Sequence, residues 1–342
     1  MTAIRPAPSE EHESNAVDVL SEVLAICRSE HAVTARFSLS EPWGLSSDGV
    51  PGAMIRLARR ASYWLEIEGM PPMRIEPGDL VMMRPRVPHR LVSAPGARTT
   101  PFAGLTARHA RGPRDENPLV FEHGGGGEMT EMFSAQIWFS AYCRHVVLSV
   151  LPPFIRMREA DLPMAGVLGQ TMQGLVEETL ERRAGWRLSA ARMGELLLVN
   201  LLRAHLPALD SKSGGWLRGL GDPNIARALM AMHRAPGQAW SVATLAGEAG
   251  LSRTRFAERF KDLVGVTPIS YLTAHRMAVA AQAMEAGTMP LVRIAEDAGY
   301  ESGKEFSRAF SRWSGLSPSA YLRQEASRRA GVTMAPAGKP PG

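Results

Sequence analysis

Apolar residues recur with a helical period at two places in the C-terminal third of the chain. Two trios share the spacing i, i+4 and i+7: Phe256, Phe260 and Leu263 in the first, and Phe306, Phe310 and Trp313 in the second. This spacing places each trio on one helix face, which is buried against its neighbours. A short apolar segment precedes each trio and ends at a glycine, Gly250 or Gly299, that can adopt the left-handed conformation closing a helix. The pattern predicts two helix-turn-helix units, at about 240–263 and 290–313.

The two units are copies of one pattern, about fifty residues apart. Beyond the apolar trios, the correspondence extends to Gly265 with Gly315, Pro268 with Pro318, and Tyr271 with Tyr321. Between the copies, Pro268 to about Glu285 reads as one helix of roughly 25 Å. A helix of this length can hold two recognition helices near the roughly 34 Å spacing of successive major grooves on one side of DNA.

The helix faces opposite the apolar trios carry polar and charged side chains that can reach base edges and phosphates. The candidate DNA contacts are Arg253, Thr254, Arg255, Ala257, Glu258 and Lys261 in the first unit, and Ser302, Lys304, Glu305, Ser307, Arg308 and Arg312 in the second. Ser252 and Ser302 are also placed to cap the helices that follow them. The alternative is an all-helical packing module whose charges are merely solvated.

The distribution of charge along the chain favours DNA binding by the C-terminal third. Residues 223–330 contain 14 Lys and Arg against 9 Asp and Glu, and this excess of five equals the net charge of the whole chain. The block also resembles the DNA-binding domain of the AraC/XylS transcription regulators, on Ile294-Ala-Glu-Asp-Ala-Gly-Tyr, Phe306-Ser-Arg-Ala-Phe and Gly315-Leu-Ser-Pro, followed by Tyr321. The resemblance covers roughly residues 222–323. One departure from the family's pattern is Gly303, which lies where the second recognition helix begins. A glycine there leaves fewer side chains to read bases.

The N-terminal part has a different texture, with short apolar segments punctuated by Pro and Gly. After a short helix over 18–28, predicted strands cover 34–39, 53–57, 62–67, 73–75, 79–83, 90–93 and 132–140. Strands at this spacing indicate a small barrel or sandwich. The segment Glu76-Pro-Gly-Asp-Leu-Val-Met-Met-Arg-Pro-Arg-Val-Pro-His89, the glycine run 124–127 and Leu151-Pro-Pro resemble the cupin-type sensor domain of some AraC regulators.

A catalytic cupin needs a His-x-His pair and a carboxylate to hold a metal. The corresponding strand at 53–59 has no histidine, and His89 stands alone, so we expect no metal, no cofactor and no enzyme activity. We predict instead a barrel that encloses a small molecule, with Arg56, Trp64 and His89 as candidate ligand contacts; each of them can equally be a core residue. Arg56 is the most informative, because a buried arginine needs an anionic partner.

Two helices, over 163–183 and 189–206, follow the strands. In AraC-type sensors such a hairpin commonly builds the dimer interface, which implies a homodimer; the alternative is packing against its own barrel. Only Cys27 and Cys143 are present, which suits a reducing compartment. No apolar stretch is long enough for a membrane span, so we expect a cytoplasmic protein without a membrane partner.

The sequence therefore predicts an α+β chain with a cupin-like β-barrel and helical hairpin followed by an all-α domain of two helix-turn-helix units joined by a long helix. The expected parts are a disordered N-terminus at 1–16, a sensor domain at 17–207, a linker at 208–221, a DNA-binding domain at 222–325 and a disordered tail at 326–342. The predicted function is a sequence-specific activator that binds double-stranded DNA, responds to an unidentified small molecule and is able to contact RNA polymerase. The alternatives are a metal-dependent cupin enzyme fused to a DNA-binding domain and an architectural DNA-binding protein with a vestigial barrel.

Overall fold

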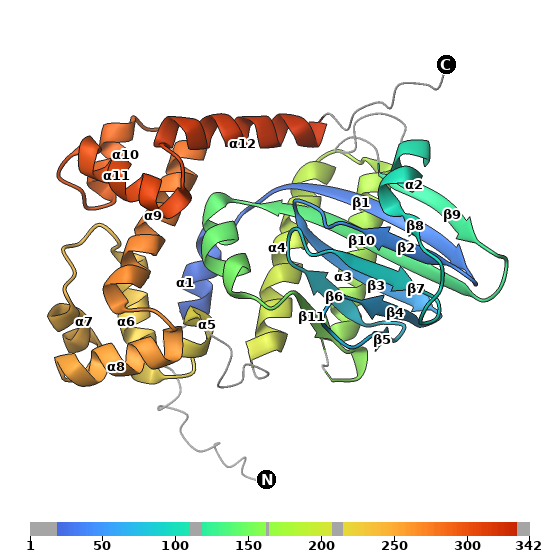
Figure 1. The fold of residues 1–342 in the computed structure, drawn as a ribbon, viewed down its shortest axis with the longest axis horizontal. Helices are drawn as coiled ribbons and strands as arrows, with labels where there is room; N and C mark the ends of the chain where they lie inside the picture. Colours follow the sequence, from blue (N-terminus) through green and yellow to red (C-terminus); the bar gives the residue numbers. More distant parts are fainter. Residues whose placement is uncertain (1–18, 110–117, 162–163, 207–214, 334–342) are drawn as a thin grey trace, which may run out of the picture.

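The computed structural model describes residues 19–109, 118–161, 164–206 and 215–333. The chain forms a two-sheet sandwich with a helical layer, followed by an all-helical part (Figure 1). The strands are β1 (Ser29–Ser40), β2 (Gly44–Ser47), β3 (Ala53–Arg60), β4 (Tyr63–Glu66), β5 (Met73–Ile75), β6 (Leu80–Met83), β7 (His89–Val92), β8 (Thr100–Pro101), β9 (Leu119–Gly124), β10 (Met129–Phe139) and β11 (Phe154–Met157). The α+β class and the cupin-like strand region are confirmed.

Two sheets face each other across an apolar interior. The larger sheet has the order β11-β6-β3-β10-β1-β9 and the smaller one β5-β4-β7-β2-β8. Neighbouring strands are antiparallel except β1 with β9 and β2 with β8, which are parallel. Along β3, Met54 and Ala58 point between the sheets, whereas Ala53, Ile55 and Leu57 belong to the core cluster on the other face. Both faces of this strand are therefore buried, as its continuous apolar sequence requires.

The helical layer covers the outer face of the larger sheet. In the sensor part the helices are α1 (Val19–Ile26), α2 (Phe102–His109), α3 (Ala165–Glu181) and α4 (Trp186–His205), with short irregular helices η1 (Cys143–Val147), η2 (Leu148–Val150) and η3 (Glu159–Asp161). The helices α3 and α4 pack on each other and on the larger sheet. The predicted hairpin therefore packs against its own sheet, which is one of the two arrangements expected for it.

The C-terminal part is helical throughout its described length, apart from turns. Its helices are α5 (Trp216–Gly219), α6 (Pro223–Arg234), α7 (Val242–Ala249), α8 (Arg253–Val264), α9 (Pro268–Ala286), α10 (Leu291–Asp297), α11 (Gly303–Ser314) and α12 (Pro318–Thr333). Asp222 caps α6 by accepting hydrogen bonds from the backbone of Asn224 and Ile225. The long helix predicted from residue 268 to about 285 is α9.

Two predicted boundaries need correction within the described residues. The expected linker at 208–221 contains α5, whose Trp216 is 1% exposed and donates from its indole nitrogen to the Val146 carbonyl at 2.8 Å. This large aromatic side chain packs in the core, so residues 215–221 are part of the folded structure. The helix α12 extends to Thr333, past residue 326, where the sequence predicted the start of the tail. The predicted disorder at 1–16 and the rest of the linker and tail, 208–214 and 334–342, lie outside the described residues.

Candidate nucleic-acid interface

The first helix-turn-helix unit is built by the local signals that its sequence contains. Ser241 and Thr244 form a capping box at the start of α7, and Gly250 ends this helix with φ of 66°. The Ser252 hydroxyl then accepts a hydrogen bond from the Arg255 backbone nitrogen at 3.4 Å, which caps α8. The turn between the two helices is therefore fixed by one glycine and one serine.

The second unit repeats this construction around Gly299, between α10 and α11. Gly299 has a φ of 78°, and a Cβ at this position would lie 2.8 Å from the Gly237 carbonyl oxygen. The Ser302 hydroxyl accepts from the Glu305 backbone nitrogen at 3.2 Å and caps α11. Gly303 is the first residue of α11, as expected from the sequence.

The predicted apolar faces are buried as expected. Phe256, Phe260, Phe306 and Phe310 are each 0% exposed. Leu263 and Trp313, the last members of the two trios, are half-buried and pack against core clusters. The aromatic rings within each recognition helix contact each other, with centroids 5.6 Å apart in both pairs.

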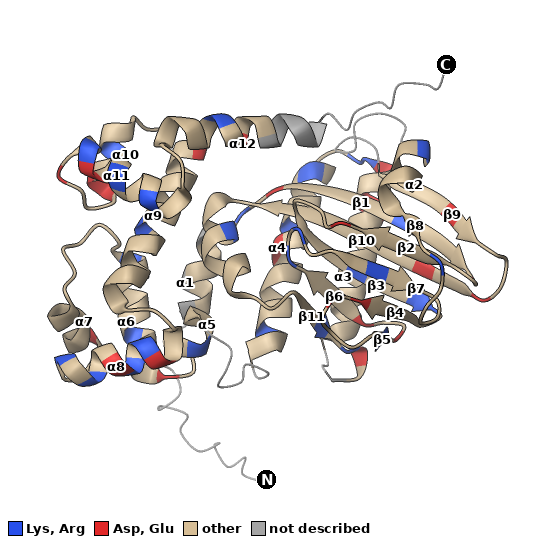
Figure 2. Ribbon diagram, viewed as in Figure 1, with Lys and Arg blue, Asp and Glu red and all other residues tan. Residues whose placement is uncertain are grey.

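The predicted DNA contacts lie on the opposite faces of α8 and α11. The exposed ones are Arg253, Thr254, Arg255, Glu258 and Lys261 on α8, Lys304, Glu305, Arg308 and Arg312 on α11, and Ser302 at its cap, while Ala257 and Ser307 are half-buried. Figure 2 shows Lys and Arg positions on both helices, interspersed with acidic ones. With 19 residues, α9 spans about 28 Å between the units.

One basic residue of α8 has a structural role that the sequence did not reveal. Arg259 forms an ion pair with Asp222, the capping residue of α6, and thereby ties α8 to α6. Burial alone would raise the pKa of Asp222, but the hydrogen bonds from Arg259 and from the Ile225 and Asn224 backbone lower it below its usual value. This pairing accounts for Arg259 without DNA.

The sensor part contacts the helical part through residues 142–147, which the sequence did not single out. The Tyr142 hydroxyl lies 2.9 Å from Nδ1 of His233 on α6 and 3.4 Å from Nδ1 of His275 on α9. Nε2 of His233 lies 2.7 Å from the Tyr271 hydroxyl. Burial lowers the pKa of His275 to about 4, with a smaller contribution from Arg276, and burial and His275 lower the pKa of His233. Both imidazoles are therefore neutral near pH 7.

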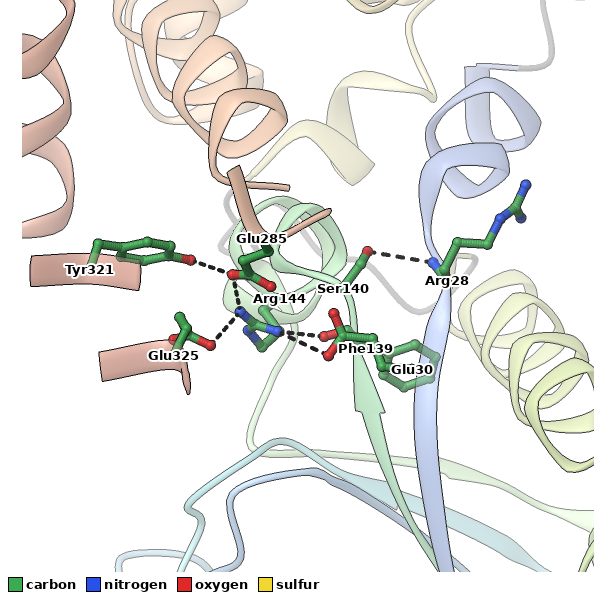
Figure 3. A network of polar contacts seen from close by, with 8 residues as sticks. All are labelled: Arg28, Glu30, Phe139, Ser140, Arg144, Glu285, Tyr321 and Glu325. Atoms are coloured by element: carbon green, nitrogen blue, oxygen red, sulfur yellow. Dashed lines mark hydrogen bonds and ion pairs between the residues drawn. The ribbon is translucent and has the colours of Figure 1, made fainter. Parts of the chain in front are cut away.

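Arg144 forms the second part of this contact (Figure 3). Its Nη2 lies 2.9 Å from Oε1 of Glu285 on α9 and 3.1 Å from Oε2 of Glu325 on α12. Glu285 also accepts a hydrogen bond from the Tyr321 hydroxyl at 2.8 Å. Burial alone would lower the pKa of Arg144, but Glu285, Glu325, Tyr321 and Glu30 raise it above its usual value. This cation therefore stays charged and joins the sensor part to α9 and α12, the helices on either side of the second unit.

The same segment reaches the second recognition helix itself. The His145 ring lies against Trp313 of α11, with centroids 4.5 Å apart. His145 is exposed by its surface area, but desolvation by the neighbouring groups, followed by the nearby Arg144, lowers its pKa to about 4. Residues 142–147 thus contact the scaffolds of both helix-turn-helix units, which links the sensor part mechanically to both.

Between the two sheets, the structure brings together two of the three predicted ligand contacts. Arg56, 4% exposed, donates from Nη1 to Nε2 of His89 at 2.9 Å. Nε2 must accept this bond, so the proton of His89 is on Nδ1, which donates to the Val87 carbonyl at 2.9 Å. Burial and then Arg56 lower the pKa of His89 to about 3, and burial lowers the pKa of Arg56 to about 10.

This interior is closely filled. A cavity of about 10 Å³ beside Arg56 and His89 is also lined by Phe37, Phe102 and Leu91, and is large enough for about one water molecule. Trp64 is half-buried and alternates with the buried Tyr63 and Leu65 along β4, so it faces away from this cavity. Nε of Arg56 and the Tyr63 hydroxyl are buried without a hydrogen-bond partner among the described residues.

The described residues include no group of three or more His, Cys, Asp or Glu side chains placed to bind a metal ion. Cys27 and Cys143 are both buried free thiols. No helix in the described ranges is long and apolar enough to cross a membrane.

A two-sheet sensor joined to tandem helix-turn-helix units defines a class of DNA-binding regulator. The family profile described as Cupin matches residues 18–207, and the profile described as Helix-turn-helix domain matches residues 245–324. A putative AraC-like transcription regulator of Streptomyces lividans is 31% identical over 90% of this chain and 98% of its own length. Another putative AraC-like regulator, from Streptomyces antibioticus, is also 31% identical, over 90% of this chain and 99% of its own.

Among solved structures, ToxT from Vibrio cholerae O395 matches 90% of this chain and 100% of its own at 12% identity, with a TM-score of 0.34. The identity of the Streptomyces relatives over nearly the whole length establishes the family. The chain belongs to the AraC family of DNA-binding transcription regulators, with an N-terminal cupin domain. Its homologues are transcription regulators and not enzymes.

Proposed function

We propose that the protein is a sequence-specific activator that reads two successive major grooves with the outer faces of α8 and α11. One observation carries this proposal: both recognition helices bury their phenylalanines completely and turn Arg255, Lys261, Lys304 and Arg308 to solvent. Arginine and lysine on such a face bind guanine edges and phosphates. The excess positive charge of residues 223–330 adds sequence-independent attraction to DNA.

We further propose that the cupin domain responds to a small molecule and that the protein acts as a cytoplasmic homodimer able to contact RNA polymerase. The buried Arg56, whose Nε lacks a hydrogen-bond partner among the described residues, supports an anionic group in the sensor interior. An effector larger than water would require α2 with Phe102 to move, because the present cavity holds about 10 Å³. Exposed Met164, Val167 and Leu188 on and near α3 and α4 are available to a second copy.

The proposal is tested by mapping the DNA occupancy of the tagged protein in its native host at base resolution. Sharp peaks that share a motif with two half-sites are expected, and the neighbouring genes then indicate the chemistry of the effector. Diffuse occupancy without a motif would contradict sequence-specific regulation and favour an architectural role. Falling transcription of neighbouring genes on deletion of the regulator is expected for an activator, and rising transcription for a repressor.

The proposed dimer is tested by equilibrium sedimentation of the full chain. A monomer–dimer equilibrium within the micromolar range is expected, and Val167→Glu with Leu188→Glu should shift it toward monomer because charges replace exposed apolar side chains. Only monomer across that range would contradict the dimer. Glu177→Gln, at another exposed position of α3, is the matched control.

A further inference from the structure

A cleft of about 950 Å³ lies between α1 and α4, outside the two-sheet interior. Its walls are largely apolar, and Leu20, Leu24, Leu196, Val199 and Leu206 are among the lining residues. Leu220, which directly follows α5, also lines it, so the cleft borders the helical DNA-binding part. Its volume is within the range of small-molecule sites, whereas the cavity between the sheets holds about 10 Å³.

The polar groups around this cleft are predominantly cationic. Among the described lining residues, Arg28, Arg192 and Arg203 are cationic and Glu195 is acidic. Glu195 is already engaged, because it accepts from the Ser29 backbone nitrogen at 2.9 Å and from Arg192 at 2.7 Å. Within the described ranges, the guanidinium groups of Arg28 and Arg203 form no ion pair. Two cations beside an apolar wall, neither of them paired with an acid of the described residues, favour an anion that also has an apolar body.

We propose that this cleft is a binding site for an amphipathic organic anion. The apolar body packs between the leucines of α1 and α4, and a carboxylate, sulfonate or phosphate group is held by Arg28 and Arg203. Burial of the apolar body provides most of the affinity, and the arginines select the charged group. The complementary charge distinguishes this occupant from an uncharged lipid or a cationic amine.

The cleft is connected to the DNA-binding part by a short series of contacts, and Figure 3 draws those of Arg28 with Ser140 and of Arg144 with Glu285 and Glu325. The backbone nitrogen of Ser140 donates to the carbonyl of Arg28 at 2.8 Å, and the Arg144 backbone nitrogen donates to the Ser140 carbonyl at 3.0 Å. Arg144 in turn pairs with Glu285 and Glu325. Helix α1 also packs directly on α6. An occupant that displaces α1 therefore changes the support of both helix-turn-helix units; this regulatory step rests on the proposed function.

The test uses the full-length protein and two fluorescent probes of matched shape. Anilinonaphthalene sulfonate is an amphipathic anion, and phenylnaphthylamine is the same aromatic body without the sulfonate. Wild-type protein is expected to bind the sulfonate roughly tenfold more tightly than the amine, as a charge-assisted contact provides. Absence of saturable sulfonate binding, or equal affinity for the two probes, would overturn the proposal.

Three variants assign the binding to the cleft. Arg28→Gln with Arg203→Gln should remove the preference for the sulfonate, whereas Arg98→Gln with Arg108→Gln removes the same charge from exposed positions elsewhere and should preserve it. Ala25→Trp, at an exposed lining position, should weaken both probes more than tenfold by filling the cleft. Unchanged binding in Ala25→Trp would place the probes elsewhere and overturn the site.

Other occupants of the cleft would give different results in the probe-binding measurements. Probe binding that begins only after residues 1–17 are deleted would show that the chain itself occupies the cleft, and affinity that falls with protein concentration would indicate a second copy; both would overturn the proposal. DNA affinity measured at saturating probe should shift at least threefold. An unchanged DNA affinity would overturn the coupling alone, whereas a probe-free protein without specific DNA binding would contradict the proposed function instead.

Discussion

The guanidinium of Arg144 lies 2.9 Å from the carboxylate of Glu285, and this pair joins the sensor domain to the end of the helix that separates the two DNA-binding units. The Glu285 side chain is 3% exposed and that of Arg144 16%. A pair so poorly solvated costs desolvation energy, but removing one partner costs more, because the other charge is left buried. The contact therefore favours one arrangement of the two domains over others.

Arg144→Met should lower the free energy of unfolding by about 3 kcal/mol, because the buried carboxylate of Glu285 would lose its cationic partner. Urea denaturation followed by circular dichroism measures the change. Arg293→Met is the matched control: its pairs with Glu296 and Asp297 are exposed, so a loss of less than about 1 kcal/mol is expected. Equal losses in the two variants would show that the interdomain pair has no special role.

Stability should fall as the pH is lowered from 7 to 5. The pKa values of the buried His89, His233 and His275 are all lowered in the folded state, to about 3 for His89 and about 4 for His275. Below the unfolded pKa of about 6.5, the unfolded chain binds protons that the folded chain does not, so stability is present above that value and lost below it. The buried His89 and His275 should each lower the free energy of unfolding by about 2 kcal/mol at pH 5.

His275→Gln separates this effect from a general acid effect. The difference in the free energy of unfolding between pH 7 and pH 5 should shrink by about 2 kcal/mol, because one proton-linked group is removed. His109→Gln, which replaces an exposed histidine, is the matched control. A pH dependence identical in wild type and His275→Gln would mean that His275 is not held neutral.

The features predicted correctly are those with local signals. The phenylalanine spacing, the glycines Gly250 and Gly299 and the capping serines act within a few residues, and the structure contains each of them as expected. The faces of a short strand were harder to assign: Trp64 lies in a correctly predicted strand but faces away from the interior cavity. Its face depends on which neighbouring strands pair with β4, which the pattern of one strand does not specify.

The interdomain contact was missed because its signals are not local. Tyr142 meets His233 across 91 positions of sequence, and Arg144 meets Glu285 across 141. His233 and Glu285, the partners in the helical part, belong to no sequence motif. Tyr142 and Arg144 lie at or next to η1, a short irregular helix without apolar periodicity. The cleft beside α1 could not be predicted either, because it depends on how α1 and α4 are placed relative to each other in the folded chain.

Gly299→Ala should destabilise the protein more than Gly250→Ala. Both glycines have positive φ, where alanine costs about 1 kcal/mol. At Gly250, the neighbour of an added Cβ is the flexible end of Arg227, at 3.2 Å, whereas at Gly299 it is the Gly237 backbone oxygen at 2.8 Å. Thermal denaturation of both variants measures the difference. Equal melting temperatures would show that the Gly237 segment moves away without cost.

Arg308→Ala should distinguish base reading from general attraction to phosphates. Arg308 is exposed on α11, on the face opposite Phe306 and Phe310, and forms no ion pair among the described residues. If it contacts a base edge, its loss should cost about 1 to 3 kcal/mol on the cognate site and relax the base preference at one position. Binding to the cognate site and its single-base variants, measured by fluorescence anisotropy at fixed salt, gives both quantities.

Arg323→Ala removes the same charge from the exposed side of α12 and should lower affinity for all sequences evenly or not at all. If Arg308→Ala also lowers affinity evenly, Arg308 contacts phosphate, and the base-reading face of α11 must be assigned to other residues.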